Sequence, residues 1–324
     1  MNIEKVVPPS VHNYDPCSDS DAESDTDTDD EDEGDEADEG EENSLWDEIV
    51  TFRDDVEATM FQLAQDYRFV RQLHGSEKAM IYHVVDTSNG DNICLKIRYR
   101  SSCNSGVPVE AILLYYIKEV HIGTGLQILD TYYHDNDMCV IASPMYEAAD
   151  TWFEDMFQKT SVPAMSFATQ LLHRIDDLHR LGVMWRDCKP SNMAMVPEGK
   201  DSTLYLLDFD LAFYSADPAN CERTSVLGTD GFMSSLILSK GPYGFEQDYY
   251  SAGVCIGMLL FSVIETDVSI EIVREWRDTS PIGHWDAGWH KLHKCFLALT
   301  ASPIDMNLAR SVLNLPLSCL MVST

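Results

Sequence analysis

The chain is poor in positive charge. Only 22 of its 324 residues are Lys or Arg, against 55 Asp or Glu, so the formal net charge at pH 7 is −33. Residues 15–43 hold 17 acidic residues and no Lys or Arg, which leaves −16 of that charge for the rest of the chain. A chain this acidic repels phosphate backbones. We therefore expect no nucleic acid partner, and we expect protein substrates that are themselves basic.

Paired cysteines, a leader sequence and an apolar run of membrane length are also missing. None of the nine cysteines belongs to a C-x-x-C pair, which fits a reducing intracellular compartment. The first ten residues lack an apolar core and predict no signal peptide. The apolar stretch 252–264 is too short to cross a bilayer and predicts a buried helix. We expect an intracellular protein, cytoplasmic or nuclear, with no membrane partner.

Residues 1–43 form an acidic segment of low complexity. We expect this tail to be disordered, because its like charges repel one another and apolar residues are scarce. Two interpretations of the tail stay open. It is a solubilising segment, or it is a regulatory segment that acidophilic kinases phosphorylate and that holds basic substrates nearby. The hydroxyl residues interleaved with its acids are Ser18, Ser20, Ser24, Thr26 and Thr28.

The apolar pattern divides the remaining chain into three parts. Residues 44–66 have helical spacing and predict an amphipathic N-terminal extension. Residues 67–146 predict a β-rich lobe with one helix over residues 107–117. Residues 147–320 predict a mostly helical lobe, in which the first clear helix ends at Gly182. The strands expected in the first lobe cover residues 68–73, 80–85, 92–97, 126–133 and 138–143.

Three polar residues stand at fixed offsets in one short segment of the second lobe. Asp187 is followed by Lys189 two positions later and by Asn192 five positions later, and Asp208 follows a short apolar run downstream. Phosphoryl transfer needs such a set: a carboxylate to accept the hydroxyl proton, a cation beside the phosphoryl group, and an amide and a carboxylate to hold Mg²⁺. The motif predicts Asp187 and Lys189 as catalytic residues, and Asn192 and Asp208 as metal ligands.

The segment Trp185–Asn192 resembles the H-R-D-x-K-x-x-N catalytic loop of protein kinases, with tryptophan in place of histidine. Asp208-Phe209-Asp210 resembles the D-F-G motif, with aspartate in place of glycine. Lys189 follows the pattern of Ser/Thr kinases, so the chain is identified as a member of that family. The other cues, in the family's order, are Gly228–Met233 (G-T-x-x-Y), Asp248–Val254 (D-x-W-S-x-G) and Val312–Leu317 (L-L-x-H-P-F).

The resemblance implies a bilobal α+β fold, with a β-rich N-lobe and a helical C-lobe, that phosphorylates protein Ser or Thr with ATP and Mg²⁺. Lys96, at the end of an Ile-Cys-Leu-Lys run, resembles the V-A-I-K lysine that grips the ATP phosphates. Glu110 is its expected ion-pair partner, and Glu119 is the alternative. An acidic leader on a divergent kinase domain is similar in layout to kinases of large DNA viruses such as herpesviruses, which act in a host cell.

The glycine-rich loop departs furthest from the family. Aligning Ile81 with the valine after G-x-G-x-x-G places His74, Ser76 and Ala79 where glycines belong, and leaves Gly75 one position off. Side chains there hold backbone N–H groups away from the phosphates, so we expect weaker or altered ATP binding. The nucleotide-binding residues that the resemblance implies are Lys96, Glu110, Gly75, Ser76, Ile81 and, in the expected hinge, Met145.

A second departure concerns a buried ion pair. The glutamate of the family's A-P-E motif is replaced by Leu236, and its arginine partner aligns with Met306. A half-lost pair would leave an unpaired buried charge and cost about 3–5 kcal/mol, whereas losing both charges need not destabilise the protein. We therefore expect an intact fold. Arg186, next to Asp187, is expected to pair with a phosphate on Thr224 or Ser225.

Two other functions stay open. The missing glycines, Trp185 and Asp210 favour a pseudokinase that binds ATP as a scaffold or an allosteric regulator. A kinase-fold enzyme that acts on a small molecule is the other alternative. The peptide-positioning segment around Gly228 opposes that alternative.

Overall fold

The computed structural model divides the chain into two compact units. The first comprises Met1–Tyr115 and Gln127–Met145, and the second comprises Tyr116–Leu126 and Tyr146–Thr324. Expectations for most of the acidic tail, for the start of the N-terminal extension and for the last residues of the kinase motifs fall outside what the structure describes. The described residues are 4–5, 54–76, 79–99, 109–120, 130–133, 138–146, 161–198, 201–217, 221–261, 269–279 and 286–315.

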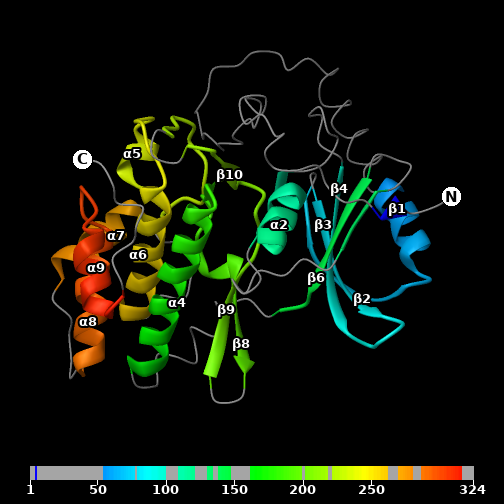
Figure 1. Ribbon diagram of the computed structural model, residues 1–324, viewed down its shortest axis with the longest axis horizontal. Helices are drawn as coiled ribbons and strands as arrows, with labels where there is room; N and C mark the ends of the chain where they lie inside the picture. Colours follow the sequence, from blue (N-terminus) through cyan, green and yellow to red (C-terminus); the bar gives the residue numbers. More distant parts are fainter. Residues whose placement is uncertain are drawn as a thin grey trace, which may run out of the picture. The chain divides into compact units, whose positions relative to one another are not determined.

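The first unit is built on one antiparallel sheet with the strand order β1-β5-β6-β4-β3-β2 (Figure 1). The strands expected from the sequence are confirmed, and helix α2 (Val109–Val120) lies where a helix was expected. Strand β1 was not expected, because its two residues belong to the segment predicted to be disordered. The strands are β1 (Glu4–Lys5), β2 (Tyr67–Gly75), β3 (Ala79–Asp86), β4 (Asn92–Tyr99), β5 (Asp130–Tyr133) and β6 (Met138–Pro144).

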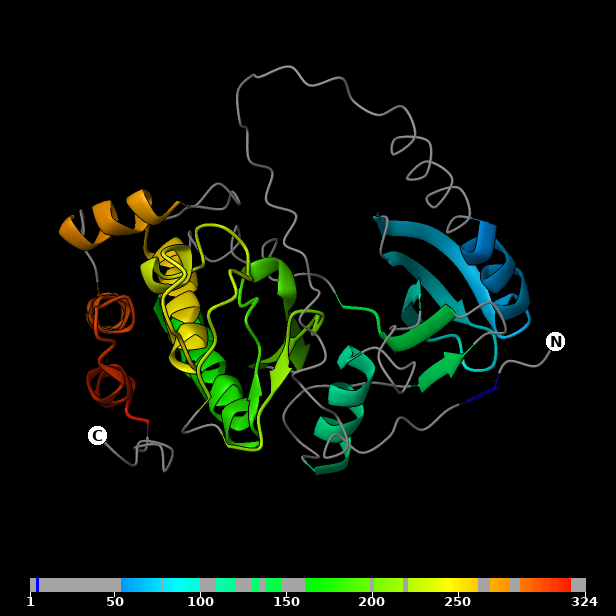
Figure 2. The ribbon, with the colours of Figure 1, turned by 90° about the horizontal axis from the view of Figure 1, so that it is seen from above.

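Alternation along β4 separates the core of this unit from its functional face. Ile93, Leu95 and Ile97 are buried together in one apolar cluster with Val56 of the helix over residues 54–63. Successive side chains of a strand point to opposite faces, so Lys96 points away from that cluster. Helix α2, which carries the ion-pair partner of Lys96, therefore lies on the other face of the sheet from helix 54–63 (Figure 2).

The second unit is largely helical, with α6 at its centre. Every residue from Gln247 to Leu260 of this helix is buried, because α4 and α8 pack against it (Figure 2). This confirms the buried helix expected from the apolar stretch. None of the helices in the described stretches is long and apolar enough to span a membrane. The helices are α4 (Ser161–Arg180), α5 (Ser235–Leu238), α6 (Glu246–Phe261), α7 (Ile270–Asp278), α8 (Ala287–Leu299) and α9 (Met306–Leu313).

Two glycines of α6 let α8 approach closely. A Cβ atom at Gly253 would lie 2.7 Å from the Cβ of Leu299, and one at Gly257 would lie 2.9 Å from the Phe296 ring. Distances below about 3 Å are not tolerated between packed carbon atoms, so both positions exclude larger residues. This helix pair supports residues 185–192, hereafter the catalytic segment, through Asp248 of α6.

A β-hairpin interrupts this helical unit, and the expectation of a mostly helical lobe missed it. Strands β8 (Met193–Glu198) and β9 (Asp201–Leu206) pair along their whole length, and β7 (Val183–Met184) pairs with β10 (Phe213–Tyr214). Short apolar runs such as these fit a strand and a buried helix equally well, so periodicity alone did not separate them. The hairpin matters for function, because it begins directly after Asn192 and ends two residues before Asp208.

Candidate active site

The catalytic segment is anchored from below by Asp248 of α6. Its carboxylate is fully buried and accepts hydrogen bonds from the backbone N–H groups of Trp185 (2.8 Å) and Arg186 (2.7 Å). His179 of α4 lies 2.8 Å from the same carboxylate. These bonds hold Arg186 in a left-handed conformation with φ 67°, which a non-glycine residue adopts only under such constraint. Asp248 therefore fixes the backbone at the start of the catalytic segment.

Asp187 is the focus of a hydrogen-bond network. Its Oδ2 accepts from Nδ2 of Asn192 (2.6 Å) and lies 3.0 Å from Nζ of Lys189. Its Oδ1 accepts from the hydroxyl of Thr229 at 2.6 Å. The side chain of Asp187 is buried, with 8% of the residue exposed. The sequence motif is thus one cluster in space, in which the carboxylate is fixed by three neighbours.

Thr229 is a site residue whose role sequence reasoning missed. Besides donating to Asp187, its hydroxyl accepts from Nζ of Lys189 at 2.7 Å. The residue therefore bridges the expected base and the expected cation across 42 positions of sequence. The Gly228-Thr229 motif was recognised as a resemblance, but spacing alone gave no reason to place its hydroxyl against Asp187.

Asp208 reaches the site through the β8–β9 hairpin. The N–H of Leu207 donates to the carbonyl of Asn192 at 2.8 Å, so the residues on either side of the hairpin lie next to each other. Asp208 is exposed and has φ 52°, a conformation that aspartate tolerates better than most residues. The indole N–H of Trp185 donates to the carbonyl oxygen of Asp208 at 2.8 Å, and the ring lies beside that of Phe209.

Asp210, which replaces the glycine of the D-F-G motif, fits without backbone strain. The non-glycine residues with positive φ in the described stretches include Asp208 but not Asp210, so the left-handed freedom of glycine is not needed there. Its N–H donates to Oδ1 of Asp208 at 3.2 Å, and its side chain is exposed. This backbone N–H helps to orient the carboxylate of Asp208, and a glycine at position 210 would supply the same donor.

Asn192 and Asp208 have the chemistry of ligands for a hard divalent cation. Nδ2 of Asn192 donates to the carboxylate and to the carbonyl oxygen of Asp187, at 2.6 and 3.1 Å. The amide oxygen of Asn192 is therefore left as the acceptor, and it receives no hydrogen bond from the described residues. Amide and carboxylate oxygens suit Mg²⁺ or Ca²⁺. The two expected metal ligands fit the group that the resemblance implies.

In the first unit, Lys96 and Glu110 form a buried ion pair. Nζ of Lys96 lies 2.9 Å from Oε2 of Glu110, and the two residues are 8% and 4% exposed. Arg98 lies 3.9 Å from the same carboxylate oxygen. A buried pair of this kind holds the ammonium group in one place. The structure brings together the two residues that the resemblance pairs, and the side chain of Glu119 falls outside the described residues.

Where the resemblance expects a glycine-rich loop, the described residues Ser76 and Ala79 bond to each other between β2 and β3. The N–H of Ser76 donates to the carbonyl of Ala79 at 2.9 Å, and the N–H of Ala79 donates to the Ser76 hydroxyl at 3.1 Å. Gly75 is exposed, and a Cβ there would lie 2.5 Å from the side-chain nitrogen of Gln72 and 2.7 Å from the sulfur of Met80. The hydrogen bond to Ala79 occupies the backbone N–H of Ser76, a donor of the kind that binds phosphates in glycine-rich loops.

Ile81 lies on β3 and Met145 directly follows β6, and both strands pair with β4, which carries Lys96. Ile81 of β3 stands directly opposite Lys96 in the antiparallel register. The N–H of Met145, just after β6, donates to the carbonyl of Asn92 at 3.0 Å. Any contact from Met145 to an adenine ring therefore uses its side chain or its carbonyl and not its N–H.

The guanidinium groups of Arg186 and Arg223 both lie near the ring of Phe213. The guanidinium of Arg223 lies 3.5 Å from the centre of the Phe213 ring, and that of Arg186 lies 5.8 Å from it. Burial lowers the pKa of Arg186, and the positive charge of Arg223 contributes in the same direction. The hydroxyl of Tyr243 lies 3.2 Å from the Ser225 hydroxyl and donates to its carbonyl. Ser225 thus lies next to Tyr243, which itself interacts with Arg186.

A family model described as Protein kinase domain matches residues 67–280. The chain is 38% identical to calcium-dependent protein kinase 25 of Arabidopsis thaliana over 97 residues, which are 30% of this chain and 18% of that protein. It is 31% identical to the calcium/calmodulin-dependent protein kinase type II alpha chain of Drosophila melanogaster over 111 residues, 33% of this chain and 21% of that protein. It is 25% identical to serine/threonine-protein kinase zyg-8 of Caenorhabditis elegans over 268 residues, 78% of this chain and 33% of that protein.

The chain spans no more than a third of the length of these three relatives. The family model covers more than half of the chain and includes both the Lys96–Glu110 pair and the segment around Asp187. The β-rich first unit and the helical second unit agree with the α+β fold that the resemblance implies. The chain belongs to the protein kinase family.

Proposed function

We propose that the chain is an active Ser/Thr protein kinase, which transfers the γ-phosphate of ATP to hydroxyl groups of proteins. The arrangement around Asp187 carries this proposal. Its carboxylate is held by Asn192, Thr229 and Lys189 at distances between 2.6 and 3.0 Å. A general base must be fixed within hydrogen-bond reach of the proton that it accepts. Such a network supports activity, because a scaffold has no need of it.

In the proposed reaction, the acceptor hydroxyl gives its proton to Asp187 as its oxygen forms a bond to the γ-phosphorus. The bond between that phosphorus and the leaving oxygen of ADP breaks in the same displacement. Lys189 supplies a positive charge beside the transferring group, where negative charge is spread over the phosphoryl oxygens. Thr229 keeps this ammonium group in place through its hydroxyl.

The nucleotide and its metal would be held by the remaining residues. Lys96, oriented by Glu110, binds phosphate oxygens, while Gly75, Ser76, Ile81 and Met145 contact the nucleotide as the resemblance implies. A divalent ion neutralises phosphate charge in this family, and we propose Mg²⁺ held by Asn192 and Asp208. The N–H of Ser76 is already bonded to the carbonyl of Ala79, so we expect weak ATP binding.

The proposed substrates are basic proteins, because the chain carries a net charge of −33. The pattern of Lys189 favours Ser and Thr over Tyr as acceptors. We further propose an intracellular protein, whose acidic segment 15–43 is itself phosphorylated by acidophilic kinases. We also propose, from the similarity in layout, that the chain is related to the kinases of large DNA viruses.

The test uses the full chain, ATP labelled at the γ-phosphate, Mg²⁺, and basic and acidic test proteins. Label on Ser or Thr of the basic protein, identified by phosphoamino-acid analysis, supports the proposal. The specific observation that favours a pseudokinase is the occupied N–H of Ser76 in place of a glycine-rich cradle. ATP binding without any transfer would therefore replace the kinase by an ATP-binding scaffold, and label on Tyr alone would contradict the acceptor class.

A further inference from the structure

A cavity of about 640 Å³ lies in the second unit, among α5, α6, α7 and the segment between α8 and α9. Leu236 and Met306, which stand where the family has an ion pair, both line it. Neither side chain fills the volume or carries a charge. Its size falls within the range of sites that bind small ligands or single peptide side chains.

Two arginines of α7 give one side of this cavity a positive charge. Arg274 is exposed and makes no ion pair or hydrogen bond with the residues that the structure describes. Arg277 donates only to neutral acceptors, the carbonyl of Leu297 (3.1 Å) and the hydroxyl of Thr300 (2.7 Å). Neither guanidinium has a carboxylate partner among the described residues, although the chain has 55 acidic residues.

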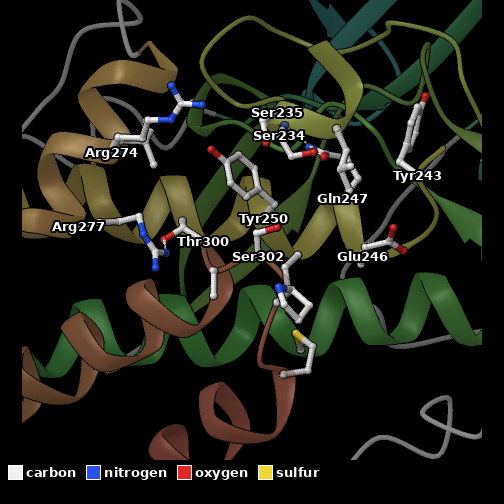
Figure 3. Close-up of a pocket in the computed structure, with 16 residues that line it drawn as sticks. Ser234, Ser235, Tyr243, Glu246, Gln247, Tyr250, Arg274, Arg277, Thr300 and Ser302 are labelled. Carbon is white, nitrogen blue, oxygen red and sulfur yellow. Dashed lines mark hydrogen bonds between the residues drawn. The ribbon is translucent and has the colours of Figure 1, made fainter. Parts of the chain in front are cut away.

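Neutral donors lie beside the two arginines. The ring of Tyr250 lies beside the two arginines, and its hydroxyl is directed toward Arg274 (Figure 3). The pKa of Tyr250 is raised by burial, while the charges of both arginines act to lower it. Ser302 adds a second hydroxyl to the lining. The guanidinium group of Arg277 is directed away from that of Arg274, toward Thr300 (Figure 3). An anion beside Arg274 would therefore meet one guanidinium group and the hydroxyl of Tyr250, donors that bind carboxylates and phosphates strongly.

Glu246 is the one residue with a carboxylate side chain among the described residues that line the cavity, and it does not neutralise the arginines. Glu246 lies on the opposite side of the cavity from the arginines (Figure 3). It accepts the N–H of Gly244 at 2.8 Å, which holds it at the start of α6. The positive side of the cavity is therefore not neutralised from within.

We propose that this cavity is a docking site for an acidic peptide of a partner protein, with a carboxylate side chain bound by Arg274 and the hydroxyl of Tyr250. A peptide suits the site because the cavity is open to solvent along α7, where Arg274 is exposed. The chain as a whole repels acidic peptides, so such binding requires a local positive site. This site is separate from the catalytic segment and would recruit a class of partner opposite in charge to the proposed substrates.

The experiment measures binding of a fluorescent peptide of alternating Asp and Ser residues to the full chain by anisotropy. We expect saturable binding, and a loss of at least about tenfold in affinity for Arg274→Gln, because a charge-assisted hydrogen bond is removed. The matched control is Arg68→Gln, which removes the same charge from an exposed position of β2. It should bind like the wild type, and a peptide of Asn and Ser should not bind.

Arg274 makes no hydrogen bond or ion pair with the described residues, so its variant should remain folded, which a thermal melt verifies. Tyr250→Phe provides a second variant that keeps the ring and removes the hydroxyl, and it should weaken binding by several-fold. Equal affinity of the wild type and Arg274→Gln would overturn the proposal. Binding of inorganic phosphate without binding of the peptide would also overturn it, because the cavity would then be a site for small anions only.

Discussion

The indole N–H of Trp185 donates to the backbone carbonyl of Asp208 at 2.8 Å. This bond joins the catalytic segment to the expected metal ligand across the β8–β9 hairpin. Trp185 stands where the family's motif has histidine. Its ring nitrogen is a hydrogen-bond donor, as a histidine ring nitrogen can be. The substitution thus keeps a ring N–H donor at this position.

Replacing Trp185 by Phe should lower phosphate transfer. The phenyl ring keeps much of the packing against Phe209 but has no donor for the carbonyl of Asp208, so the metal ligand is held less firmly. A net hydrogen bond of about 1 kcal/mol corresponds to a loss of about fivefold in kcat/KM. Trp185→His, which restores a ring N–H, should recover part of the loss. Steady-state kinetics of the two variants would contradict this role if both matched the wild type.

Thr229 should act through its hydroxyl group. Thr229→Val keeps the shape and removes both hydrogen bonds, to Asp187 and from Lys189. We expect transfer to fall by about 10- to 100-fold, because a displaced catalytic group costs that much in rate. Thr229→Ser keeps the hydroxyl and should stay close to wild type. A loss in Thr229→Ser as large as that in Thr229→Val would contradict the role of the hydroxyl, because the serine variant keeps it.

Removing one partner of the buried ion pair between Asp176 and Arg310 should strongly destabilise the second unit. The two residues are 6% and 2% exposed and form a direct hydrogen bond, and the hydroxyl of Tyr249 donates to Asp176 at 2.6 Å. Arg310→Met leaves a buried carboxylate without its cation, so it should lower the free energy of unfolding by about 3–5 kcal/mol.

The double variant Asp176→Asn with Arg310→Met should be more stable than Arg310→Met alone, since it no longer buries an unpaired charge. Urea denaturation of the wild type, both single variants and the double variant gives the coupling energy. Additive losses would contradict the pairing.

Stability should depend on pH through the Cys295 thiol of α8. Burial raises its pKa to about 12 from the ordinary value of 9.0. The folded state keeps a proton that the unfolded chain releases, so this contribution is complete below pH 9 and is lost as the pH rises toward 12. The free energy of unfolding should fall by about 1.4 kcal/mol per pH unit over this window. Denaturation curves of Cys295→Ala at alkaline pH should show a shallower fall, and equal slopes would contradict the assignment.

Many strands of the first unit could be predicted because apolar residues recur at every second position along them. Ile93, Leu95 and Ile97 face the core while Lys96 faces α2, which follows from the two-residue period of a strand. The hairpin β8–β9 could not be predicted in this way, because short apolar runs have no distinguishing period. Its existence depends on pairing across the turn, which only the folded chain shows.

The candidate site divides along a similar line. Asp187, Lys189 and Asn192 lie within six residues, so their proximity could be predicted from spacing. Thr229 is 42 positions from Asp187, and its contact depends on how the downstream segment folds back. The cavity beside Arg274 was not predicted either, because its lining comes from segments up to 72 positions apart in sequence, between Ser234 and Met306. Tertiary packing, which leaves no local signal, sets these contacts.

The most direct test of the account is transfer of labelled γ-phosphate by the wild type beside Asp187→Asn and Asp208→Asn. Asp278→Asn, at an exposed position of α7, is the matched control for loss of one negative charge. We predict transfer by the wild type and the control, and a loss of at least about 100-fold in both site variants, because each removes a group that the reaction requires. Equal transfer by all four proteins would contradict the assigned site, and the label would then come from another kinase.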